Sequence, residues 1–538
     1  MINNTSNNHE YDAIIVGAGF AGLYQLICLR DQLGLNCLVI ETGDDVGGTW
    51  YWNRYPGARC DTESHAYSYY FSEELLKEWT WSERYPGHAE IRKYINFVAD
   101  KFDLKKNILF NEKVINAEFN DSSNKWNLVT SNENHFQAKF LIAAVGCLSN
   151  TNIPKIKGLD SFEGKYYHTG NWPKTGVSFT DKKVGQIGTG STGIQAVPVI
   201  AAEAKHLTVF QRTANYSIPA RNAPLSQKFK DHVKEDHKYY KEFLKRTPNG
   251  HPFEISSRLV SDVNEEEMNE IYEKAWEKGG LQFRATFNDL VTNIEANKTA
   301  SEFIKGKIRK TVSNKKFANI LSDIDHPYAG KRPPIDSHYF EAFNRDNINL
   351  IDLRSDPILQ INQKGIQTKE NHFDLDIIVF ATGYDAMTGP LLNMNIAGKQ
   401  NLKLDDCWKE GPKSFLGLQI PGFPNLFTIT GPGSPSVLTN MPMAIEQHVE
   451  WIRDCISYVN EKNYSRIEAD PKSSKEWGDE VNAVANKTLL PTVKHSWYLG
   501  ANIPGKPQVF MPYAGGLPKY TEVCNEVKSN NYKGFNLA

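Results

Sequence analysis

The stretch Tyr11-Asp-Ala-Ile-Ile-Val-Gly-Ala-Gly-Phe-Ala-Gly22 decides the fold of this chain. Its first six residues have the apolar, β-branched composition of a buried parallel strand. The glycines then turn the chain into residues 23–33, which have helical spacing, and a second apolar strand is expected at residues 37–41. Strand, G-x-G-x-x-G turn and helix in this order predict a Rossmann-like βαβ unit that binds a dinucleotide.

The same arrangement returns in the middle of the chain. An apolar strand at residues 183–188 leads into Gly188-Thr-Gly190-Ser-Thr-Gly193, a helix from Gly193, and a strand at residues 207–211. One such glycine motif is weak, because many turns match it by chance, but two in matching contexts are a much stronger signal. The sequence therefore predicts an α/β protein with two Rossmann-like dinucleotide-binding domains.

The remaining segments set the expected domain boundaries. Apolar runs at residues 141–146 and 376–383 both end at a glycine and would return the chain to a nucleotide crevice. Between about residues 222 and 330 the strand patterns give way to Lys/Glu-rich helical ones, such as residues 268–276 before Gly279. We expect the first unit in residues 1–148 and 385–538, the second in 149–221 and 330–384, and a helical insertion in 222–329, to which we assign no chemistry.

Composition narrows the class of partner. The 538 residues include 61 basic and 63 acidic ones, a formal charge of -2, which argues against nucleic acid. Seven scattered cysteines without a C-x-x-C pair indicate no disulfide framework and no metal site. Residues 1–10 are polar and are expected to form a disordered tail, and no apolar run approaches the length of a membrane span. We expect a cytoplasmic monomer or weak oligomer, without stable membrane insertion, that acts on a small molecule.

Two residues of opposite charge predict that the two units bind different nucleotides. Glu41 stands 19 residues after Gly22, and Arg212 stands 19 residues after Gly193. A carboxylate accepts hydrogen bonds from a free ribose diol, whereas a guanidinium suits a 2′-phosphate. The first unit is therefore expected to bind FAD and the second NADPH, although a surface acid and a surface base remain the plainer alternatives.

A longer motif lies between the two glycine turns. It reads Phe162-x-Gly164-x-x-x-His168-x-x-x-Trp172-Pro173, and it is joined by residues 47–61, 330–333, 381–385 and 497–506. With these motifs the chain resembles the type I Baeyer–Villiger monooxygenases over nearly its whole length. The Trp172-Pro173 ending favours ketone oxygenation over the reactions of the sister flavin-containing and N-hydroxylating enzymes.

The resemblance implies a reaction that uses FAD, NADPH and O2. In that family a C4a-peroxyflavin attacks a ketone, and the Criegee-type adduct rearranges to an ester or lactone. Two alternatives stay open: an N- or S-oxygenating flavin monooxygenase, and a flavin-bearing NADPH sensor without oxygenation. A disulfide reductase is disfavoured because paired cysteines are missing.

The resemblance also assigns roles to residues. Arg332 matches the active-site arginine, and Asp61 matches a carboxylate near the flavin that we expect to stay ionised and to orient the arginine. The plainer alternatives are a surface pair of Arg332 with Asp336 and an exposed loop aspartate. Phe162, Gly164, His168, Trp172 and Pro173 are expected to couple the domains, with His168 as a hydrogen-bonded structural group.

The full set of predicted contacts follows from the motifs and the resemblance together. For FAD they are Gly17, Gly19, Phe20, Gly22, Glu41, Gly48, Thr49, Trp50, Asp61, Tyr67, Val114 and Met441. For NADP they are Gly188, Gly190, Ser191, Thr192, Gly193, Gln195, Arg212, Thr213, Lys331, Trp497 and Asn502, the last two in a C-terminal loop expected to act as a lid. Ser436, Val437 and Leu438 are expected to line the ketone pocket.

Overall fold

The computed structural model describes residues 9–538, and its largest sheet is built from both ends of the chain. The strand order is β17-β4-β5-β6-β1-β2-β3, with β18 beside β6. β1 pairs in parallel with β2 and β6, as the glycine-turn strand of a Rossmann unit should. The strands are β1 (His9–Val16), β2 (Cys37–Ile40), β3 (Ile108–Leu109), β4 (Val114–Asn120), β5 (Lys125–Thr130), β6 (His135–Ala143), β17 (Ile396–Ala397) and β18 (Leu426–Thr428).

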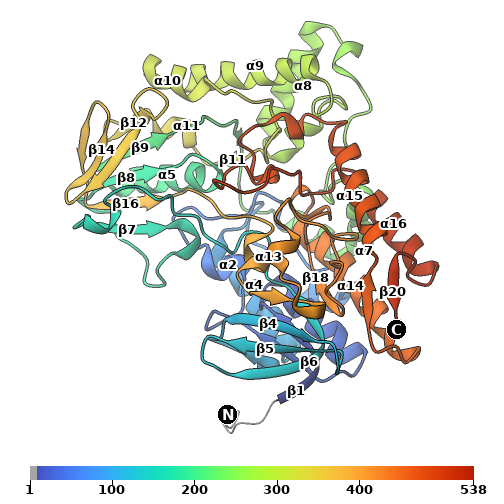
Figure 1. Cartoon of the computed structure of the whole chain (residues 1–538). Coiled ribbons are helices and arrows are strands. Elements are labelled where there is room, and N and C mark those ends of the chain that lie inside the picture. The colour runs from blue at the N-terminus through green and yellow to red at the C-terminus, as the bar shows by residue number, and fades with distance from the viewer. Residues whose placement is uncertain (1–8) are drawn as a thin grey trace.

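A second, five-stranded sheet is parallel throughout and has the order β12-β9-β8-β16-β7. Its strands are β7 (Lys165–His168), β8 (Lys183–Ile187), β9 (His206–Gln211), β12 (Ile348–Asp352) and β16 (Ile377–Phe380). All of them fall between β6 and β17 in the chain, so one nucleotide-type sheet is inserted within the other. Figure 1 shows the smaller sheet at the upper left and the larger sheet below it.

Helices cover both sheets and form two large apolar cores. In the first, α1 (Phe20–Leu26) continues as a π-helix over Ile27–Gln32 and packs against α14 (Met441–Glu461). In the second, α5 (Ser191–Glu203) packs beneath the parallel sheet, and it begins two residues before the Gly193 expected from the sequence. The other helices outside the insertion are α2 (Thr49–Trp52), α3 (Glu73–Glu78), α4 (His88–Lys101), α11 (Tyr339–Ala342), α12 (Gly389–Leu392), α13 (Leu404–Cys407), α15 (Pro471–Ala485) and α16 (Leu517–Ser529).

The region expected to be a helical insertion is helical. It holds α6 (Gln227–Glu235), α7 (His237–Arg246), α8 (Glu265–Lys278), α9 (Ile294–Thr311) and α10 (Lys315–Ser322). The side chain of Asn264 caps α8 by accepting from the Glu267 N–H, and Gly279 ends the helix at a φ of 67°. α8 buries Tyr272 and Trp276, as its sequence spacing predicts. The exact domain boundaries stay predictions.

Short strands complete the fold. β10 (Ile218–Pro219) pairs with β11 (Ile335–Asp336) where the chain leaves and re-enters the second unit around the insertion. A three-stranded sheet of β13 (Ile358–Asn362), β14 (Gly365–Thr368) and β15 (His372–Asp374) flanks the parallel sheet, and β19 (Ile467–Ala469) pairs with β20 (Phe535–Leu537).

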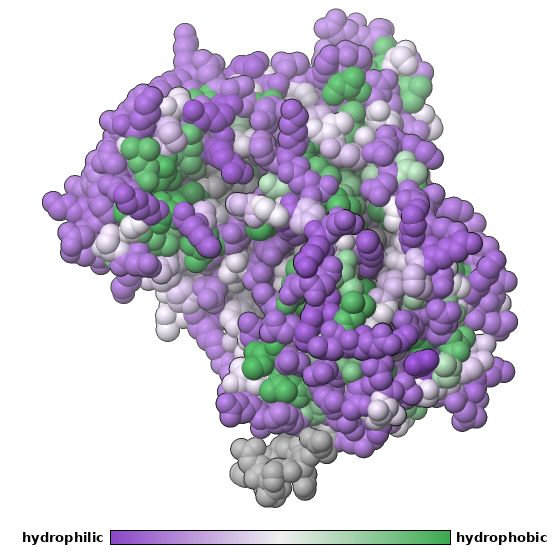
Figure 2. All heavy atoms as spheres, in the orientation of Figure 1, coloured by the Kyte–Doolittle hydropathy of each residue, from purple (hydrophilic) through white to green (hydrophobic). Residues whose placement is uncertain are grey.

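The first residue that the structure describes, His9, already belongs to strand β1. Because β1 begins at His9, the prediction of a disordered tail is wrong for residues 9 and 10, and residues 1–8 lie outside the described part of the chain. Figure 2 shows a mainly hydrophilic face on which hydrophobic side chains form separate small areas. Within residues 9–538 no helix combines the length and the hydropathy that crossing a bilayer requires.

Candidate active site

The first glycine turn is fixed by close backbone contacts. Gly17 has a φ of +106°, and a Cβ there would lie 2.7 Å from the carbonyl oxygen of Ala144. A Cβ on Gly22 would lie 1.8 Å from the carbonyl oxygen of Gly17, so the helix can meet the turn only without a side chain. The N-cap residue of α1, Gly19, has no side-chain cap. The first N–H groups of the helix are thus left for another acceptor, and this arrangement fits the pyrophosphate of a dinucleotide.

The second turn repeats this geometry around open space. A Cβ on Gly188 would lie 2.4 Å from the carbonyl oxygen of Ala381, and one on Gly193 would lie 2.3 Å from the carbonyl oxygen of Gly188. A Cβ on Gly190, the N-cap residue of α5, would meet nothing within 4 Å. The free space above uncapped N–H groups is where a phosphate could approach the backbone.

The two residues predicted to distinguish the nucleotides directly follow equivalent strands, Glu41 after β2 and Arg212 after β9. Glu41 is buried, and its carboxylate accepts from the N–H groups of Ala18 at 2.7 Å and Gly43 at 2.6 Å. Burial raises the pKa of Glu41 against these hydrogen bonds. Arg212 is exposed and forms no ion pair within the described chain. The acid is therefore integrated into the first turn, whereas the base is free for a ligand.

Lys331 lies close enough to Arg212 for the two positive charges to affect each other. Burial lowers the pKa of Lys331; Asp325 opposes this effect, and the positive charge of Arg212 adds to it. Two neighbouring cations that repel each other, one of them directly after β9, fit a doubly charged 2′-phosphate. Thr213, predicted as a further donor, accepts at its carbonyl oxygen from the Thr189 hydroxyl at 2.9 Å.

Arg332 and Asp61 meet although 271 positions separate them in the chain. The Nε and Nη2 atoms of Arg332 each donate to one oxygen of Asp61 at 2.7 Å, and Nη1 donates to the carbonyl oxygen of Val437 at 2.8 Å. The alternative pair with Asp336 does not form, because Asp336 accepts from Ser217 and from the Tyr339 N–H instead. Burial would raise the pKa of Asp61, but Arg332 keeps it below its ordinary value. The carboxylate is thus ionised, as expected.

Residues of the helical insertion also reach this pair, which the sequence reasoning missed. His251 has its pKa lowered to about 3 by burial and by the charges of Arg332 and Arg284, so its imidazole is neutral. Arg284 donates to the side chain of Asn249, which in turn donates to the carbonyl oxygen of Leu438. The only sequence signal was Arg284 itself, a charge between the apolar residues Phe283 and Ala285.

The predicted pocket wall forms one 3₁₀ turn, Ser436–Leu438. Ser436 is fully buried, and its hydroxyl lies 3.7 Å from the sulfur of Met387, so it packs behind the wall. Val437 and Leu438 present their carbonyl oxygens to Arg332 and Asn249. The turn thus positions polar side chains through its backbone.

The aromatic loop after Glu41 packs around Trp50 and Tyr67. Trp50 lies on α2, and its indole N–H donates to the Tyr67 hydroxyl at 3.0 Å. The ring of Phe20 meets the ring of Tyr67 edge-on at 5.3 Å. Among the other predicted FAD contacts, Thr49 begins α2 directly after Gly48, Val114 begins β4, and Met441 begins α14.

The long motif lies at the edge of the parallel sheet. His168 ends β7, accepts at Nδ1 from the Gly170 N–H at 3.0 Å, and has its pKa lowered to about 4 by burial. Its ring meets that of Tyr384 edge-on at 5.9 Å, and the Tyr384 hydroxyl hydrogen-bonds to Asn53 of the aromatic loop. This contact links the second unit to the first, in line with a structural histidine.

The rest of the motif is packing. Trp172 is buried between Tyr167 and Phe179, with Pro173 directly after it. A Cβ on Gly164 would lie 2.5 Å from the backbone carbonyl oxygen of Asp376, so this position requires glycine.

Gln195, a predicted NADP contact, hydrogen-bonds to the aromatic loop of the first unit. Its Oε1 accepts from the Tyr55 hydroxyl at 2.7 Å, and its Nε2 donates to the Arg59 carbonyl oxygen at 3.1 Å. A Cβ on Gly57 would lie 2.3 Å from the Gln195 carbonyl oxygen. Gln195 on α5 therefore joins the second unit to the aromatic loop of the first, beside Ser191 and Thr192 in the first turn of the helix.

The C-terminal loop is tied to the segment after β16. Asn502 donates from Nδ2 to the Tyr384 carbonyl oxygen at 2.8 Å, and Lys506 pairs with Asp385. The ring of Trp497 contacts that of Tyr498 at a tilt of 56°, with ring centroids 4.5 Å apart. The loop thus lies on the same segment that contacts His168.

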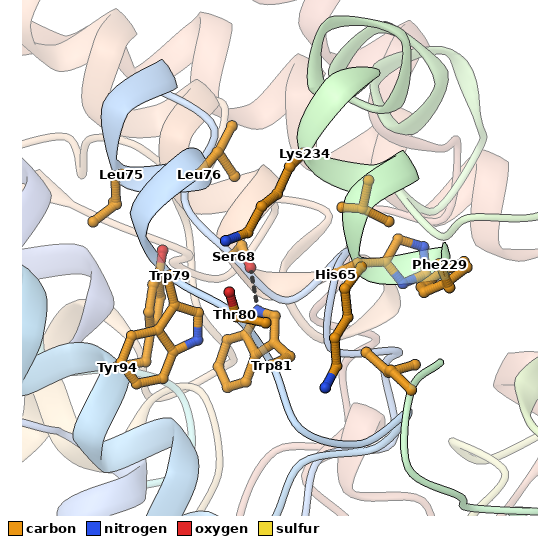
Figure 3. A pocket seen from close by; sticks show the side chains of 13 residues that line it. His65, Ser68, Leu75, Leu76, Trp79, Thr80, Trp81, Tyr94, Phe229 and Lys234 are labelled. Atoms are coloured by element: carbon orange, nitrogen blue, oxygen red, sulfur yellow. Dashed lines mark hydrogen bonds between the residues drawn. The ribbon is translucent and has the colours of Figure 1, made fainter. Parts of the chain in front are cut away.

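A separate small apolar pocket, with a cavity volume of about 40 Å³, lies where α6 meets the segment around α3. Figure 3 shows Trp79, Trp81 and Tyr94 on one side and Phe229 and Lys234 of α6 on the other. No residue predicted for the site lines it. We assign it to the packing of the insertion.

Comparisons with known proteins give a consistent result. The model of the family "FMO-like: Flavin-binding monooxygenase-like" matches residues 11–299. The chain is 42% identical to a cyclohexanone 1,2-monooxygenase of Acinetobacter sp. over 99% of this chain and 97% of that protein, and 38% identical to the phenazine N-monooxygenase PhzNO1 of Lysobacter antibioticus over 100% and 98%. It also matches the crystal structure of OTEMO in complex with FAD and NADP, with a TM-score of 0.95 at 39% identity, over 99% of this chain and 100% of that one.

Proposed function

The chain belongs to the flavin-binding monooxygenase-like family, and from this premise we propose that it is an FAD-containing Baeyer–Villiger monooxygenase that uses NADPH and O2 to convert ketones to esters or lactones. The observation that carries this proposal is the position of Arg332, which donates two hydrogen bonds of 2.7 Å to the carboxylate of Asp61. The arginine comes from the segment that re-enters the second unit, and the aspartate from a loop of the first. A fixed cation therefore stands where the two units meet.

The residues of both turns fit the two cofactors. The uncapped helix starts at Gly19 and Gly190 would take the pyrophosphates of FAD and NADPH, and Arg212 with Lys331 would take the 2′-phosphate. When bound, FAD supplies the oxygen-transfer chemistry, with NADPH as the source of electrons. The chain must then bind the ketone, exclude water and stabilise charge.

Arg332 has the geometry for the last of these tasks. When a nucleophile attacks a ketone, negative charge develops on the carbonyl oxygen, and a preorganised guanidinium stabilises that charge without reorganising. Asp61 holds the guanidinium plane, and the Val437 carbonyl oxygen fixes its third side. His251 is neutral and therefore adds no second positive charge beside Arg332. Arg332 is thus the charged donor that we expect to face the substrate oxygen.

The function is tested with labelled oxygen. The purified FAD-loaded protein is incubated with NADPH, ¹⁸O2 and cyclic, linear and aryl ketones, and the products are analysed by mass spectrometry. We expect esters or lactones that carry one labelled oxygen atom. Consumption of NADPH with peroxide release and no ester from any ketone would refute the proposal.

An N-oxygenating reaction is the second candidate, because a relative with 38% identity over the whole chain is named a phenazine N-monooxygenase. The same labelled assay therefore includes phenazines, tertiary amines and sulfides. A labelled N-oxide or S-oxide without any ester would favour this reaction instead.

Paired glycine variants test the second cofactor site. We expect Gly190→Ala to fold normally, because its Cβ meets open space, but to raise the KM for NADPH at least about 10-fold by blocking the phosphate. Gly193→Ala is expected to lose about 1–3 kcal/mol of stability, because its Cβ overlaps the Gly188 carbonyl oxygen. The measurements are initial rates and thermal unfolding; a Gly190→Ala protein with unchanged KM would contradict the site.

We also propose a reducing, cytoplasmic location and a small-molecule ketone as the partner. All seven cysteines are free, and six of them are buried. Free thiols in these numbers fit a reducing compartment better than an oxidising one.

A further inference from the structure

We propose that Arg284 is a second cation on the substrate side of this site and that it binds a carboxylate carried by the ketone. The inference rests on the function proposed above and narrows its substrate class to keto acids. It assigns a recognition role to the helical insertion, which the sequence alone left without chemistry.

The position of Arg284 follows from local packing. It lies in the 3₁₀ turn Leu281–Ala285, directly after α8. Leu281, Phe283 and Ala285 are buried, whereas Gln282 and Arg284 between them are partly exposed. The buried side chains fix the turn to the insertion, so Arg284 is presented from a rigid support.

Arg284 is attached to the same wall as Arg332. Its Nη2 donates to Asn249 Oδ1 at 3.1 Å, and Asn249 Nδ2 donates to the carbonyl oxygen of Leu438 at 2.7 Å. Arg332 donates to the neighbouring carbonyl oxygen, that of Val437. Two guanidiniums are therefore tied to consecutive residues of the predicted pocket wall, one directly and one through an amide.

The two guanidiniums differ in how their charge is balanced. The charge of Arg332 is balanced by Asp61, because the arginine donates to both oxygens of that carboxylate. In contrast, no carboxylate of residues 9–538 lies within ion-pair distance of Arg284. Burial and the charge of Arg332 lower the pKa of Arg284, while nearby phenols oppose this. A partly buried cation without a counter-charge is costly, and an anionic ligand would reduce that cost.

An unpartnered hydroxyl beside Arg284 gives a second, independent indication. Tyr328 is 1% exposed, and its hydroxyl has no hydrogen-bond partner in the described part of the chain. The charge of Arg284 acts on its pKa, which places the phenol near the guanidinium. A guanidinium and a free O–H together form a donor set for the two oxygens of a carboxylate.

The test compares an acid with its neutral ester. With holoenzyme, kcat/KM is measured for 4-oxocyclohexanecarboxylate and for its methyl ester, and calorimetry measures binding of cyclohexanecarboxylate, which has no ketone to react. The variants are Arg284→Met, Arg284→Lys, and, as a matched control, Arg258→Met, since Arg258 belongs to the same insertion but pairs with Glu267 at the surface. KM for NADPH is measured in each.

We expect Arg284→Met to lower kcat/KM for the acid on the order of 100-fold, with less than about 3-fold change for the ester, and to abolish cyclohexanecarboxylate binding. Arg284→Lys should recover part of both, and Arg258→Met should change neither. Equal losses for acid and ester, or a raised KM for NADPH as the main effect, would overturn the inference. If neither ketone yields lactone but carboxylate binding still depends on Arg284, the anion site stands and the proposed function fails.

Discussion

Arg332→Ala is expected to lower ester formation on the order of 100- to 1,000-fold while NADPH still reduces the bound flavin at nearly the normal rate. In the proposed role the guanidinium stabilises charge on the substrate oxygen, whereas the glycine turns and Arg212, which are predicted to hold the cofactors, make no hydrogen bond to it. Ester formation is measured by gas chromatography, and flavin reduction by anaerobic stopped-flow absorbance. The two rates should therefore separate in this variant.

Two controls distinguish chemistry from damage to the site. Alanine leaves Asp61 without its partner and frees the Val437 carbonyl oxygen, so FAD content and circular dichroism must match those of the wild type. Arg332→Lys keeps the positive charge but loses the planar pair of hydrogen bonds to Asp61. Its ester formation should therefore exceed that of Arg332→Ala only slightly. Ester formation near the wild-type rate in Arg332→Ala would refute the role of this arginine.

The parts of the fold that follow from local pattern could be predicted from the sequence. Both βαβ units, the inserted order of the two sheets and the face that α8 buries each depend on short-range periodicity or on glycine geometry. Gly22 and Gly193 are examples, because the clash that a side chain would cause lies within five residues in each turn. Local rules decide such features.

The site could be predicted only in part. The meeting of Arg332 with Asp61 was expected from the family resemblance, since nothing local joins residues 271 positions apart. The contributions of Asn249, His251 and Arg284 were missed, because the insertion has an ordinary charged helical composition and its tertiary packing decides which charges turn inward. Gln195 shows the same limit: its predicted coenzyme contact stays a prediction, and the bridge that its amide makes between the two units could not be foreseen from its helix position.

Asp61→Ala is expected to destabilise the protein by about 2–4 kcal/mol and to reduce ester formation with it. Removing one partner of a buried ion pair leaves an uncompensated charge, here the Arg332 guanidinium, and the value lies below that of a fully buried pair because the side chains are 22% and 19% exposed. Without the carboxylate the arginine also loses the two hydrogen bonds that orient it. Thermal unfolding of the FAD-loaded protein measures the first effect, and product analysis the second.

The pH dependence and a surface pair provide the control for Asp61. Because Arg332 lowers the folded-state pKa of Asp61, its stabilisation is present above the unfolded value of about 4 and is lost as the pH falls through the folded value. The difference in melting temperature between wild type and Asp61→Ala should therefore be constant from about pH 6 to 8 and shrink only below about pH 4. Glu267→Ala removes the partner of the exposed Arg258 and should change little at any pH. An equal loss in both variants would mean that the Arg332–Asp61 pair behaves as an ordinary surface contact, and that its carboxylate does not hold the arginine for catalysis.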